Sequence, residues 1–438
     1  MYRFITITHS YLMEKLVQDE LFPISYNNIY MRGSNLLIDR RNFIPKREAT
    51  CRFQIKPQPP AIFTLDTNAM KIKADFDSVD WSFDNNTRLE SRGVHPYPAK
   101  FIPEIPREII SILGVPKGTA VLDPFCGSGT SIAEAQRLGL KTIGVDLNPI
   151  ACLITRVRTG PKMPGLKYLA QEIAQKAAQR EEHWRPQNVP NLEHWFKDSV
   201  AQCLANLVKE ICISAGPIFD DALRLSLSRI IVRVSNQESD TRYAAIEKPQ
   251  GNVYRQFVLA AEEIEKYLEL RSWKPKPEPE IICHDILDLT AKNIGQQVGL
   301  VMTSPPYPNA YEYWLYHKFR LAWLGWNPTE VKRKEIGSRS HFFSSNPHTE
   351  FDFLRQMRGL FSLLKTITVK DAHAAFVVGD SKIKGKIIDN GALLRIAAKE
   401  NDFNDVIVYP RTVASNRKAF NTKYSRAKSE QILVFKRR

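Results

Sequence analysis

Two adjacent prolines between a serine and a tyrosine make Thr303-Ser304-Pro305-Pro306-Tyr307 the segment best suited to chemistry. The prolines fix the backbone and lack N–H donors, so the neighbouring carbonyls accept hydrogen bonds without competition. Ser304 adds an acceptor and Tyr307 adds an aromatic face. This set suits a planar ring with an amino group, because fixed acceptors take both amino hydrogens while the ring stacks. The nitrogen lone pair is then aimed at an electrophilic methyl group.

A glycine-rich turn, Asp123-Pro124-Phe125-Cys126-Gly127-Ser128-Gly129-Thr130, offers a second kind of site. Its glycines leave room for a ligand near the backbone, and the following helix presents free N–H groups. Ile132 replaces a third glycine and no phosphate-loop lysine follows, which disfavours an NTPase. Asp146 follows about 20 residues later, where an acid binds ribose hydroxyls in nucleoside-binding folds. A plain tight turn capped by Asp123 is the alternative interpretation.

Short apolar strands are expected to position both segments. Residues 120–122 form a strand, 131–138 a helix that ends at Gly139, and 141–145 a second strand that ends at Asp146. This is the opening βαβ unit of a doubly wound, mostly parallel α/β sheet. Further strands are expected at 281–283 (before Asp285), 299–302 (before Thr303), 374–378, 406–409 and 432–435.

Residues 155–280 interrupt this pattern and are expected to form a helical insertion, because a single crossover needs far fewer residues. Helices are predicted at 166–182, 200–214 and 254–270, and a polar loop at 235–243.

The composition favours a polyanionic partner. Lys and Arg number 62 against 47 Asp and Glu, giving a net charge of +15 and a pI of about 9.4. Basic clusters occur at 332–334, at Lys382, Lys384 and Lys386, and over 411–438, where they are candidates for phosphate contacts or simply for solvated faces.

The six cysteines form no Cys-x-x-Cys pair and no Cys/His cluster has zinc spacing, so no metal site is expected. No signal peptide or long apolar stretch is evident. We therefore expect a cytoplasmic protein with reduced thiols and no membrane association.

Together, the segments at 123–130 and 303–307 resemble the cofactor and catalytic motifs of S-adenosylmethionine-dependent amino DNA methyltransferases. Residues 93–101, Gly-Val-His-Pro-Tyr-Pro-Ala-Lys-Phe, resemble the segment that precedes the cofactor turn in this family. Ser-Pro-Pro-Tyr is typical of the cytosine-N4 branch, whereas adenine-N6 enzymes more often have Asp or Asn in place of the serine. The resemblance covers about residues 90–150 and 281–438, and it implies a class I methyltransferase fold.

The resemblance also implies roles for single residues. Asp146 would hold the ribose hydroxyls of S-adenosylmethionine and Asp285 its adenine amino group. The extruded target base would be held by Ser304, Pro305, Pro306 and Tyr307. The expected cofactor-binding residues are Tyr97, Pro98, Asp123, Pro124, Phe125, Cys126, Gly127, Gly129, Thr130, Asp146, Asn148, Asp285 and Thr303.

The expected organisation has four parts. An N-terminal extension of unknown role covers 1–90, the cofactor-binding part 91–154, the helical insertion 155–280 and the catalytic part 281–438. Few residues follow Tyr307 besides the last strands, so the insertion is the candidate region for target recognition. The expected partner is double-stranded DNA. The resemblance implies a prokaryotic enzyme that either accompanies a cognate restriction endonuclease or acts alone, and that would act at the nucleoid. The sequence leaves the oligomeric state open.

The function expected from the resemblance is methylation of cytosine N4 in duplex DNA at a short recognition sequence, with base flipping. Adenine-N6 methylation, an RNA methyltransferase and a catalytically retired DNA-binding module are the alternatives. Cytosine-C5 methylation is disfavoured, because it needs a thiolate nucleophile and no Pro-Cys pair occurs. After the catalytic motif, Trp314 and Phe319 are expected in the core, and His317 is expected to be a hydrogen-bonded structural histidine.

Overall fold

The computed structural model describes residues 29–32, 35–38, 67–83, 93–240, 242–248, 251–309, 311–412 and 429–438. The chain divides into two compact units, Met1–Thr64 and Leu65–Arg438. In the first unit, strands β1 (Ile29–Arg32) and β2 (Asn35–Ile38) pair antiparallel. The second unit contains both motifs and is described below.

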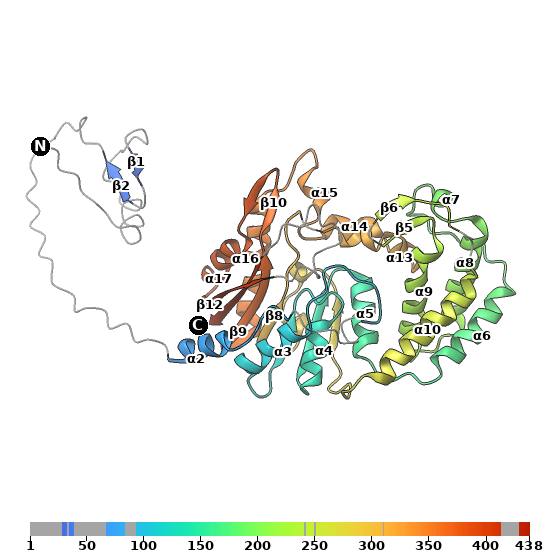
Figure 1. Cartoon of the computed structure of the whole chain (residues 1–438), viewed down its shortest axis with the longest axis horizontal. Coiled ribbons are helices and arrows are strands. Elements are labelled where there is room, and N and C mark those ends of the chain that lie inside the picture. The colour runs from blue at the N-terminus through green and yellow to red at the C-terminus, as the bar shows by residue number, and fades with distance from the viewer. Residues whose placement is uncertain are drawn as a thin grey trace, which may run out of the picture. The chain divides into compact units, whose positions relative to one another are not determined.

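A seven-stranded sheet lies at the centre of the second unit (Figure 1). Its strands are β3 (Ala120–Asp123), β4 (Lys141–Asp146), β7 (Glu280–Cys283), β8 (Val298–Thr303), β9 (Thr368–Gly379), β12 (Phe403–Thr412) and β13 (Ser429–Arg437). They lie in the order β12-β13-β9-β8-β3-β4-β7. All neighbours from β9 to β7 are parallel, and β13 runs antiparallel to both of its neighbours. The prediction of a doubly wound, mostly parallel sheet of the class I methyltransferase type is confirmed.

Helices cover both faces of the sheet because successive strand residues point to opposite sides. Leu122 of β3 packs in the cluster that contains α16 (Glu350–Ile367) and α17 (Asn390–Lys399). Val121, its neighbour, packs in the opposite cluster with α3 (Glu104–Leu113) and Ala135 of α4 (Thr130–Arg137). The central strands β3 and β8 are therefore buried on both sides, as strands of parallel sheets usually are.

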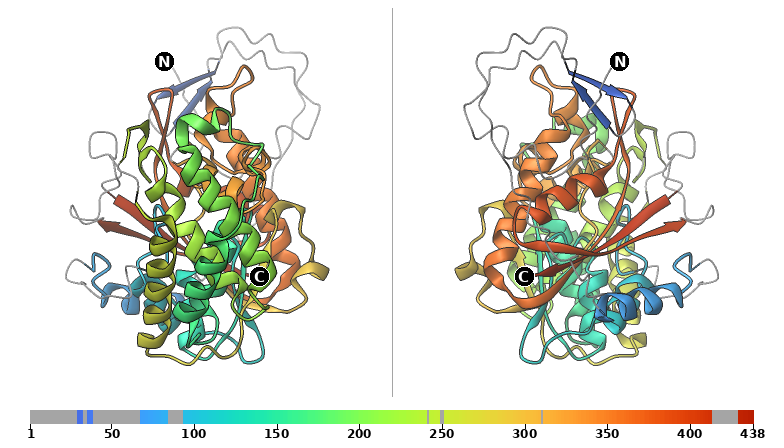
Figure 2. Two further views of the ribbon diagram at one scale, coloured as in Figure 1. Left: turned by 90° about the vertical axis from the view of Figure 1, so that its right-hand side faces the viewer. Right: turned by 90° about the vertical axis from the view of Figure 1, so that its left-hand side faces the viewer.

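Helix α2 (Thr67–Asp77) completes one of these faces, beside the red edge strands in the right-hand view of Figure 2. The ring of Phe76 stacks on that of Trp81, with ring centroids 4.9 Å apart. It also contacts the ring of Tyr409 in β12, with centroids 5.8 Å apart. Phe76 and Trp81 belong to the expected extension 1–90, most of which lies outside the described residues. Both pack in the apolar cluster on this face of the sheet.

The expectation of a basic cluster over 411–438 that is available to phosphates is wrong for Arg411. This residue is buried, its Nε donates to the carbonyl of Trp81 at 3.1 Å, and it forms an ion pair with Glu430. Arg411 is therefore structural rather than available to phosphates. Residues 413–428 of the same cluster lie outside the described part of the chain.

The expected insertion, 155–280, begins within α5 (Pro149–Thr159) and is mainly helical. Its helices are α6 (Leu166–Ala178), α7 (Leu192–Trp195), α8 (Asp198–Ser214), α9 (Asp220–Val234) and α10 (Val253–Leu270). They pack with α5 and α13 (Lys318–Trp323) around one apolar cluster, on the right in Figure 1 and facing the viewer in the left-hand view of Figure 2. Helix α9 was not predicted; nine of its fifteen residues are buried, so its apolar positions do not form a narrow stripe.

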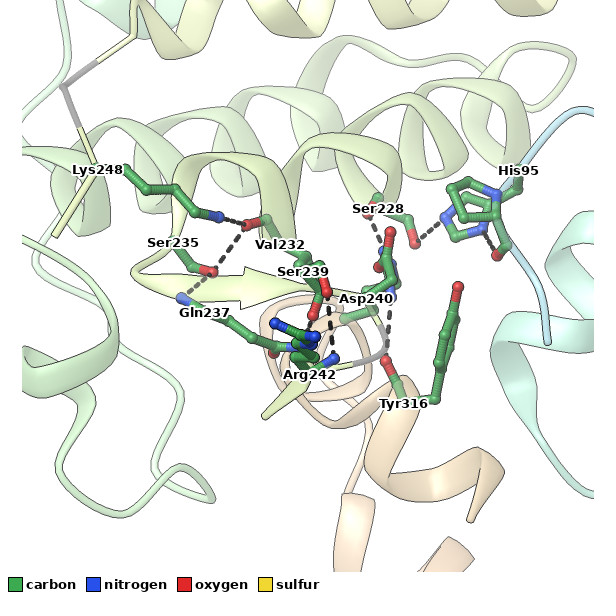
Figure 3. Close-up of polar contacts among 12 residues, drawn as sticks. His95, Ser228, Val232, Ser235, Gln237, Ser239, Asp240, Arg242, Lys248 and Tyr316 are labelled. Carbon is green, nitrogen blue, oxygen red and sulfur yellow. Dashed lines mark hydrogen bonds and ion pairs between the residues drawn. The ribbon is translucent and has the colours of Figure 1, made fainter. Parts of the chain in front are cut away.

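The polar loop predicted at 235–243 is wrong in part. Residues Gln237–Ser239 and Arg242–Ala245 form an antiparallel hairpin, β5–β6. Figure 3 shows why the chain turns here: Ser235 Oγ donates to the carbonyl of Val232 at 2.9 Å and accepts from the amide of Gln237 at 3.1 Å. These short-range bonds end α9 and start the hairpin.

Several short elements lie between the long ones. Between β7 and β8 these are η3 (Ile286–Asp288) and α11 (Ala291–Ile294). Between β8 and α16 lie α12 (Tyr313–Tyr316), α13, α14 (Pro328–Lys334) and α15 (Arg339–Phe342). After β9 comes a hairpin of β10 (Ser381–Ile383) and β11 (Lys386–Ile388). Over the described residues, no helix combines the length and apolarity needed to cross a membrane.

Candidate active site

A cleft opens at the carboxyl ends of β3, β4, β7 and β8, where the strand order reverses. This is the position at which open α/β sheets bind ligands. Its empty space is about 880 Å³, part of it open to solvent. Its walls include Tyr97, Lys100, Asp123, Phe125, Cys126, Gly127, Asp146, Asn148, Asp285, Ser304, Pro306, Tyr313, Lys334 and Glu335.

The glycine-rich turn forms the floor of this cleft, and its backbone requires glycine at two positions. Gly127 and Gly129 have φ of +50° and +73°, in the left-handed region. A Cβ on Gly129 would lie 2.7 Å from the side chain of Thr155, and one on Gly127 would lie 3.2 Å from the ring of Tyr97. The turn therefore fits closely between α5 and the Tyr97 segment.

Asp146 supports the turn from the end of β4. Its two carboxylate oxygens accept from the amides of Gly127 at 2.9 Å and Asn148 at 2.8 Å. Burial raises the pKa of the Asp146 carboxyl to about 6. Each carboxylate oxygen has more than one lone pair, so Asp146 retains acceptor capacity toward a ligand hydroxyl. Asp285 lines the same cleft and accepts from the amide of Leu287 at 3.0 Å.

Thr303 links the catalytic motif to the glycine-rich turn. Its hydroxyl donates to Oδ1 of Asp123 at 2.7 Å, and the same oxygen accepts from the amide of Phe125 at 3.0 Å. Oδ2 of Asp123 accepts a hydrogen bond from Ser131. Burial raises the pKa of Asp123 to about 6, although these hydrogen bonds oppose the shift. The last residues of β3 and β8 are thus joined in a buried network.

The proline motif contributes unequally to the cleft. Ser304 and Pro306 line it, whereas Thr303 and Pro305 are buried behind it. Tyr307 is half-buried, does not line the cleft, and its hydroxyl donates to the carbonyl of Val377 at 3.4 Å. Stacking of Tyr307 on a base stays a prediction.

The loop after Tyr307 is held on two sides. The amide of Asn309 donates to the carbonyl of Gly337 at 2.9 Å, and its side-chain nitrogen donates to the carbonyl of Lys382 at 2.6 Å. A Cβ on Gly337 would lie 2.5 Å from the carbonyl oxygen of Tyr307, so the two chains touch here. The loop is fixed between α15 and β10.

Most of the expected site residues line the cleft together. Those that line it are Tyr97, Asp123, Pro124, Phe125, Cys126, Gly127, Thr130, Asp146, Asn148, Asp285, Ser304 and Pro306. Those that do not are Pro98, Gly129, Thr303, Pro305 and Tyr307. Gly129 and Thr303 instead shape the cleft from behind, through the contacts with Thr155 and Asp123.

Sequence reasoning missed Glu335, a buried acid in the cleft wall. Its two carboxylate oxygens accept from the amides of Tyr313 at 3.0 Å and Trp314 at 2.7 Å. Burial raises the pKa of Glu335 to about 8. The ring of Tyr313 in turn stacks on that of Tyr97, with centroids 5.8 Å apart. Glu335 therefore holds an aromatic wall against the glycine-rich turn.

The expectation for His317 is wrong. The side chain is fully buried, but neither ring nitrogen has a hydrogen-bond partner among the described residues. Its ring centroid lies 5.3 Å from that of Tyr97, and burial and the Arg320 charge lower the His317 pKa well below its usual value. Phe319 is buried in the core as predicted, and Trp314 is partly buried against the same cluster.

His95 joins the cleft to the insertion. Figure 3 shows its ring beside Ser228 of α9, with 2.9 Å between Nε2 and the serine hydroxyl, while Nδ1 lies 2.6 Å from the carbonyl of Pro96. Arg320 is fully buried, bonds to the carbonyl of Ser228 at 3.1 Å and pairs with Asp240 at the hairpin. The Tyr97 segment, α13 and the insertion are therefore packed as one body.

Known proteins that resemble this chain include Type II methyltransferases. A family model described as DNA methylase matches residues 42–156. The Type II methyltransferase M.MvaI of Kocuria varians is 26% identical over 266 residues, which is 55% of this chain and 58% of that protein. M.BsoBI of Geobacillus stearothermophilus is 24% identical over 278 residues, 54% of this chain and 53% of that protein. The chain thus spans just over half the length of these relatives.

A shorter match involves a tRNA (guanine(10)-N2)-dimethyltransferase of Methanothermobacter thermautotrophicus. It is 36% identical over 52 residues, 12% of this chain and 16% of that protein.

The strand order, with the cleft at its reversal point, is that of the class I methyltransferase fold. The DNA methylase match over residues 42–156 and the two motifs make the chain similar to amino-group DNA methyltransferases.

Proposed function

We propose that this protein transfers a methyl group from S-adenosylmethionine to the exocyclic amino group of a base in duplex DNA. The observation that carries the proposal is the shared cleft, in which Ser304 and Pro306 face the same space as the Gly127 turn. The Thr303–Asp123 hydrogen bond keeps the two motifs in this relation. Base and cofactor would therefore meet where β3 and β8 end.

The cleft fits the proposed cofactor. Gly127 lines the cleft with its backbone alone, and Asp146 and Asp285 place acceptors at neighbouring strand ends. We infer that Asp146 binds the ribose hydroxyls and Asp285 the adenine amino group, with Phe125, Cys126, Tyr97 and Asn148 around them. The cofactor supplies an electrophilic methyl group. The shape of the site depends on the other expected cofactor-binding residues: Pro98, Asp123, Pro124, Gly129, Thr130 and Thr303.

The protein's own part in the reaction is to bind and orient the base. Ser304 and the carbonyls beside Pro305 accept the amino hydrogens, and Pro306 packs on the base. Tyr307 stacks on the base after turning away from Val377. The base must leave the helix to reach this position.

We favour cytosine N4 as the methylated atom because Ser304 occupies the position where adenine-N6 enzymes more often have Asp or Asn. Adenine N6 is the second candidate, because a serine hydroxyl accepts from either amino group. The tRNA-modifying relative makes RNA a third substrate to include in the test.

We further propose that the insertion 155–280 recognises the target sequence. Its hairpin β5–β6 exposes Arg242 and is fixed to the body by Tyr243, whose ring stacks on Phe319 with centroids 5.7 Å apart. Lys318 donates to the Tyr243 hydroxyl at 2.9 Å. A rigid support of this kind suits base contacts. A cognate restriction endonuclease remains a proposed partner.

The experiment is to incubate the purified protein with labelled S-adenosylmethionine and, separately, unmethylated duplex DNA and tRNA. Label in the DNA alone supports the proposal. Label in tRNA alone contradicts it. Cofactor binding measured by calorimetry, with no transfer to either nucleic acid, would indicate a retired DNA-binding module.

A further inference from the structure

Two segments far apart in the chain form a small projecting unit, which we call the knob: α15 with Phe343, and residues 381–388 of the β10–β11 hairpin. Phe342, Ile383 and Ile388 are buried together, and Leu393 packs against them. In Figure 1, β10 and α15 lie side by side at the top of the second unit. The knob is therefore held by its own apolar cluster.

The outer surface of the knob combines apolar and basic side chains. Phe343 is 60% exposed and Ile387 is 70% exposed. The Arg339 guanidinium lies 5.4 Å from the centroid of the Phe343 ring. A large exposed aromatic side chain beside a cation suits stacking on nucleic acid.

The charges of the knob remain available to a partner. Arg339, Lys382 and Lys384 are exposed, and none of them forms an ion pair with a carboxylate of the described residues. Lys386 differs, because its Nζ lies 2.7 Å from a carboxylate oxygen of Glu350. Cations without an ion-pair partner can bind the phosphates of DNA, and an apolar side chain between them can contact the stacked bases.

The position of the knob relates it to the catalytic loop. The side chain of Asn309 binds the backbone of Lys382, and the amide of Asn309 binds Gly337, two residues before α15. Both halves of the knob are thus attached to the loop that follows Tyr307. A duplex that delivers a base to Ser304 must pass next to this surface.

We propose that the knob grips the DNA duplex beside the target base, with Arg339, Lys382 and Lys384 on phosphates and Phe343 inserted into the stack that the extruded base leaves. This inference rests on the proposed function, because it assumes a DNA substrate. Extrusion costs a few kcal/mol, and an apolar side chain in the vacated position offsets part of that cost. The cations bind through counterion release, which depends on salt.

The phosphate contacts are tested by the salt dependence of DNA binding. The double variant Lys382→Gln, Lys384→Gln should lower the slope of log K against log salt by about 2, since each lost contact removes about 0.9. Affinity for S-adenosylhomocysteine and the melting temperature should stay unchanged. The matched control is Lys117→Gln with Lys292→Gln, two exposed lysines that precede β3 and β8 at the opposite end of the sheet. A wild-type slope in the first variant overturns the phosphate assignment.

The insertion of Phe343 is tested with Phe343→Ala and two DNA substrates, once sequencing of methylated DNA has identified the recognition sequence. Methylation of a fully paired site should fall about tenfold, which corresponds to about 1.4 kcal/mol. A mispaired target base should restore most of the rate, because extrusion is then easier. Leu138→Ala, which removes an exposed apolar side chain at the end of α4, should change neither rate.

The outcomes separate this inference from the proposed function. If wild-type protein methylates DNA but Phe343→Ala matches it on paired sites, or loses the same factor on both substrates, Phe343 does not insert and the inference is overturned. If wild-type protein methylates no DNA, the proposed function fails and the inference fails with it.

Discussion

Thr303 donates its hydroxyl hydrogen to Asp123 across 2.7 Å, and each of these residues is the last of a parallel strand. The bond is buried and joins positions 180 residues apart in the chain. Through it, the motif expected to hold the base and the turn expected to hold the cofactor become parts of one network. The relation between the two motifs is therefore set by the carboxyl edge of the sheet.

Thr303→Val should destabilise the protein by about 1–3 kcal/mol, because it leaves one hydrogen bond to the buried Asp123 carboxyl unmade. Urea unfolding monitored by circular dichroism measures the effect. The control is Thr142→Val, since the buried Thr142 hydroxyl has no hydrogen-bond partner within the described structure and its loss should be neutral or stabilising. Equal effects for the two variants would show that the Thr303–Asp123 bond contributes nothing specific.

Gly129→Ala should lower both stability and cofactor affinity, because the new methyl group would lie 2.7 Å from Thr155 at a left-handed backbone position. Gly139→Ala isolates the backbone part of this effect: φ is +74° there, but nothing lies within 4 Å of the added Cβ. We expect Gly139→Ala to cost about 1 kcal/mol and to leave cofactor binding intact. Thermal unfolding and calorimetric titration with S-adenosylhomocysteine provide the two measurements. A Gly129→Ala variant no weaker than the control would contradict the close packing of the turn.

Asp146→Asn should impair cofactor binding, whereas Tyr307→Ala should impair methyl transfer. Asn has one carbonyl oxygen where Asp146 uses two carboxylate oxygens, so affinity for S-adenosylhomocysteine should fall about tenfold, or about 1.4 kcal/mol. Tyr307→Ala should abolish methyl transfer and leave that affinity largely unchanged, because Tyr307 does not line the cleft.

The conservative variant Tyr307→Phe should keep activity, since it removes only the hydroxyl that bonds to Val377. Normal methylation by Tyr307→Ala would refute the stacking role.

Glu335 gives a prediction for the dependence of stability on pH. Its pKa rises from 4.5 to about 8 in the folded protein because of burial, so folding favours the protonated acid. Its contribution to stability is complete below about pH 4.5 and is lost as the pH rises through 8.

Relative to Glu335→Gln, the free energy of unfolding of the wild type should therefore decrease between these pH values, by at most about 1.4 kcal/mol per pH unit. Denaturant titrations at several pH values check this. Because Asp123 titrates in both proteins, its effect cancels in the comparison. Parallel stability curves would mean that Glu335 is not protonated on folding.

The strands and the motifs at their ends could be predicted because local signals coincide there. The run from Ala120 to Asp146 contains an apolar strand, a glycine turn, a helix end and a second strand in the order that a βαβ unit needs. Because parallel strands end at one edge, Ser304 and the Gly127 turn line the same cleft.

Other parts of the site depend on tertiary packing and leave no local signal. Glu335 ends a short basic helix, and only the fold turns it toward the amides of Tyr313 and Trp314. His317 was expected to find hydrogen bonds, but aromatic rings surround it instead. The β10–β11 hairpin packs against Phe342, which is distant from it in the sequence.

The central claim is that a base amino group meets the methyl donor at the edge formed by Ser304 and the Gly127 turn. The most direct measurement is mass spectrometry of nucleosides from unmethylated DNA that has been treated with the protein and methyl-deuterated S-adenosylmethionine. The predicted result is a labelled methyl group on the exocyclic nitrogen of deoxycytidine, with deoxyadenosine N6 as the second candidate. Label on carbon 5 of deoxycytidine, or no labelled deoxynucleoside, would contradict the account.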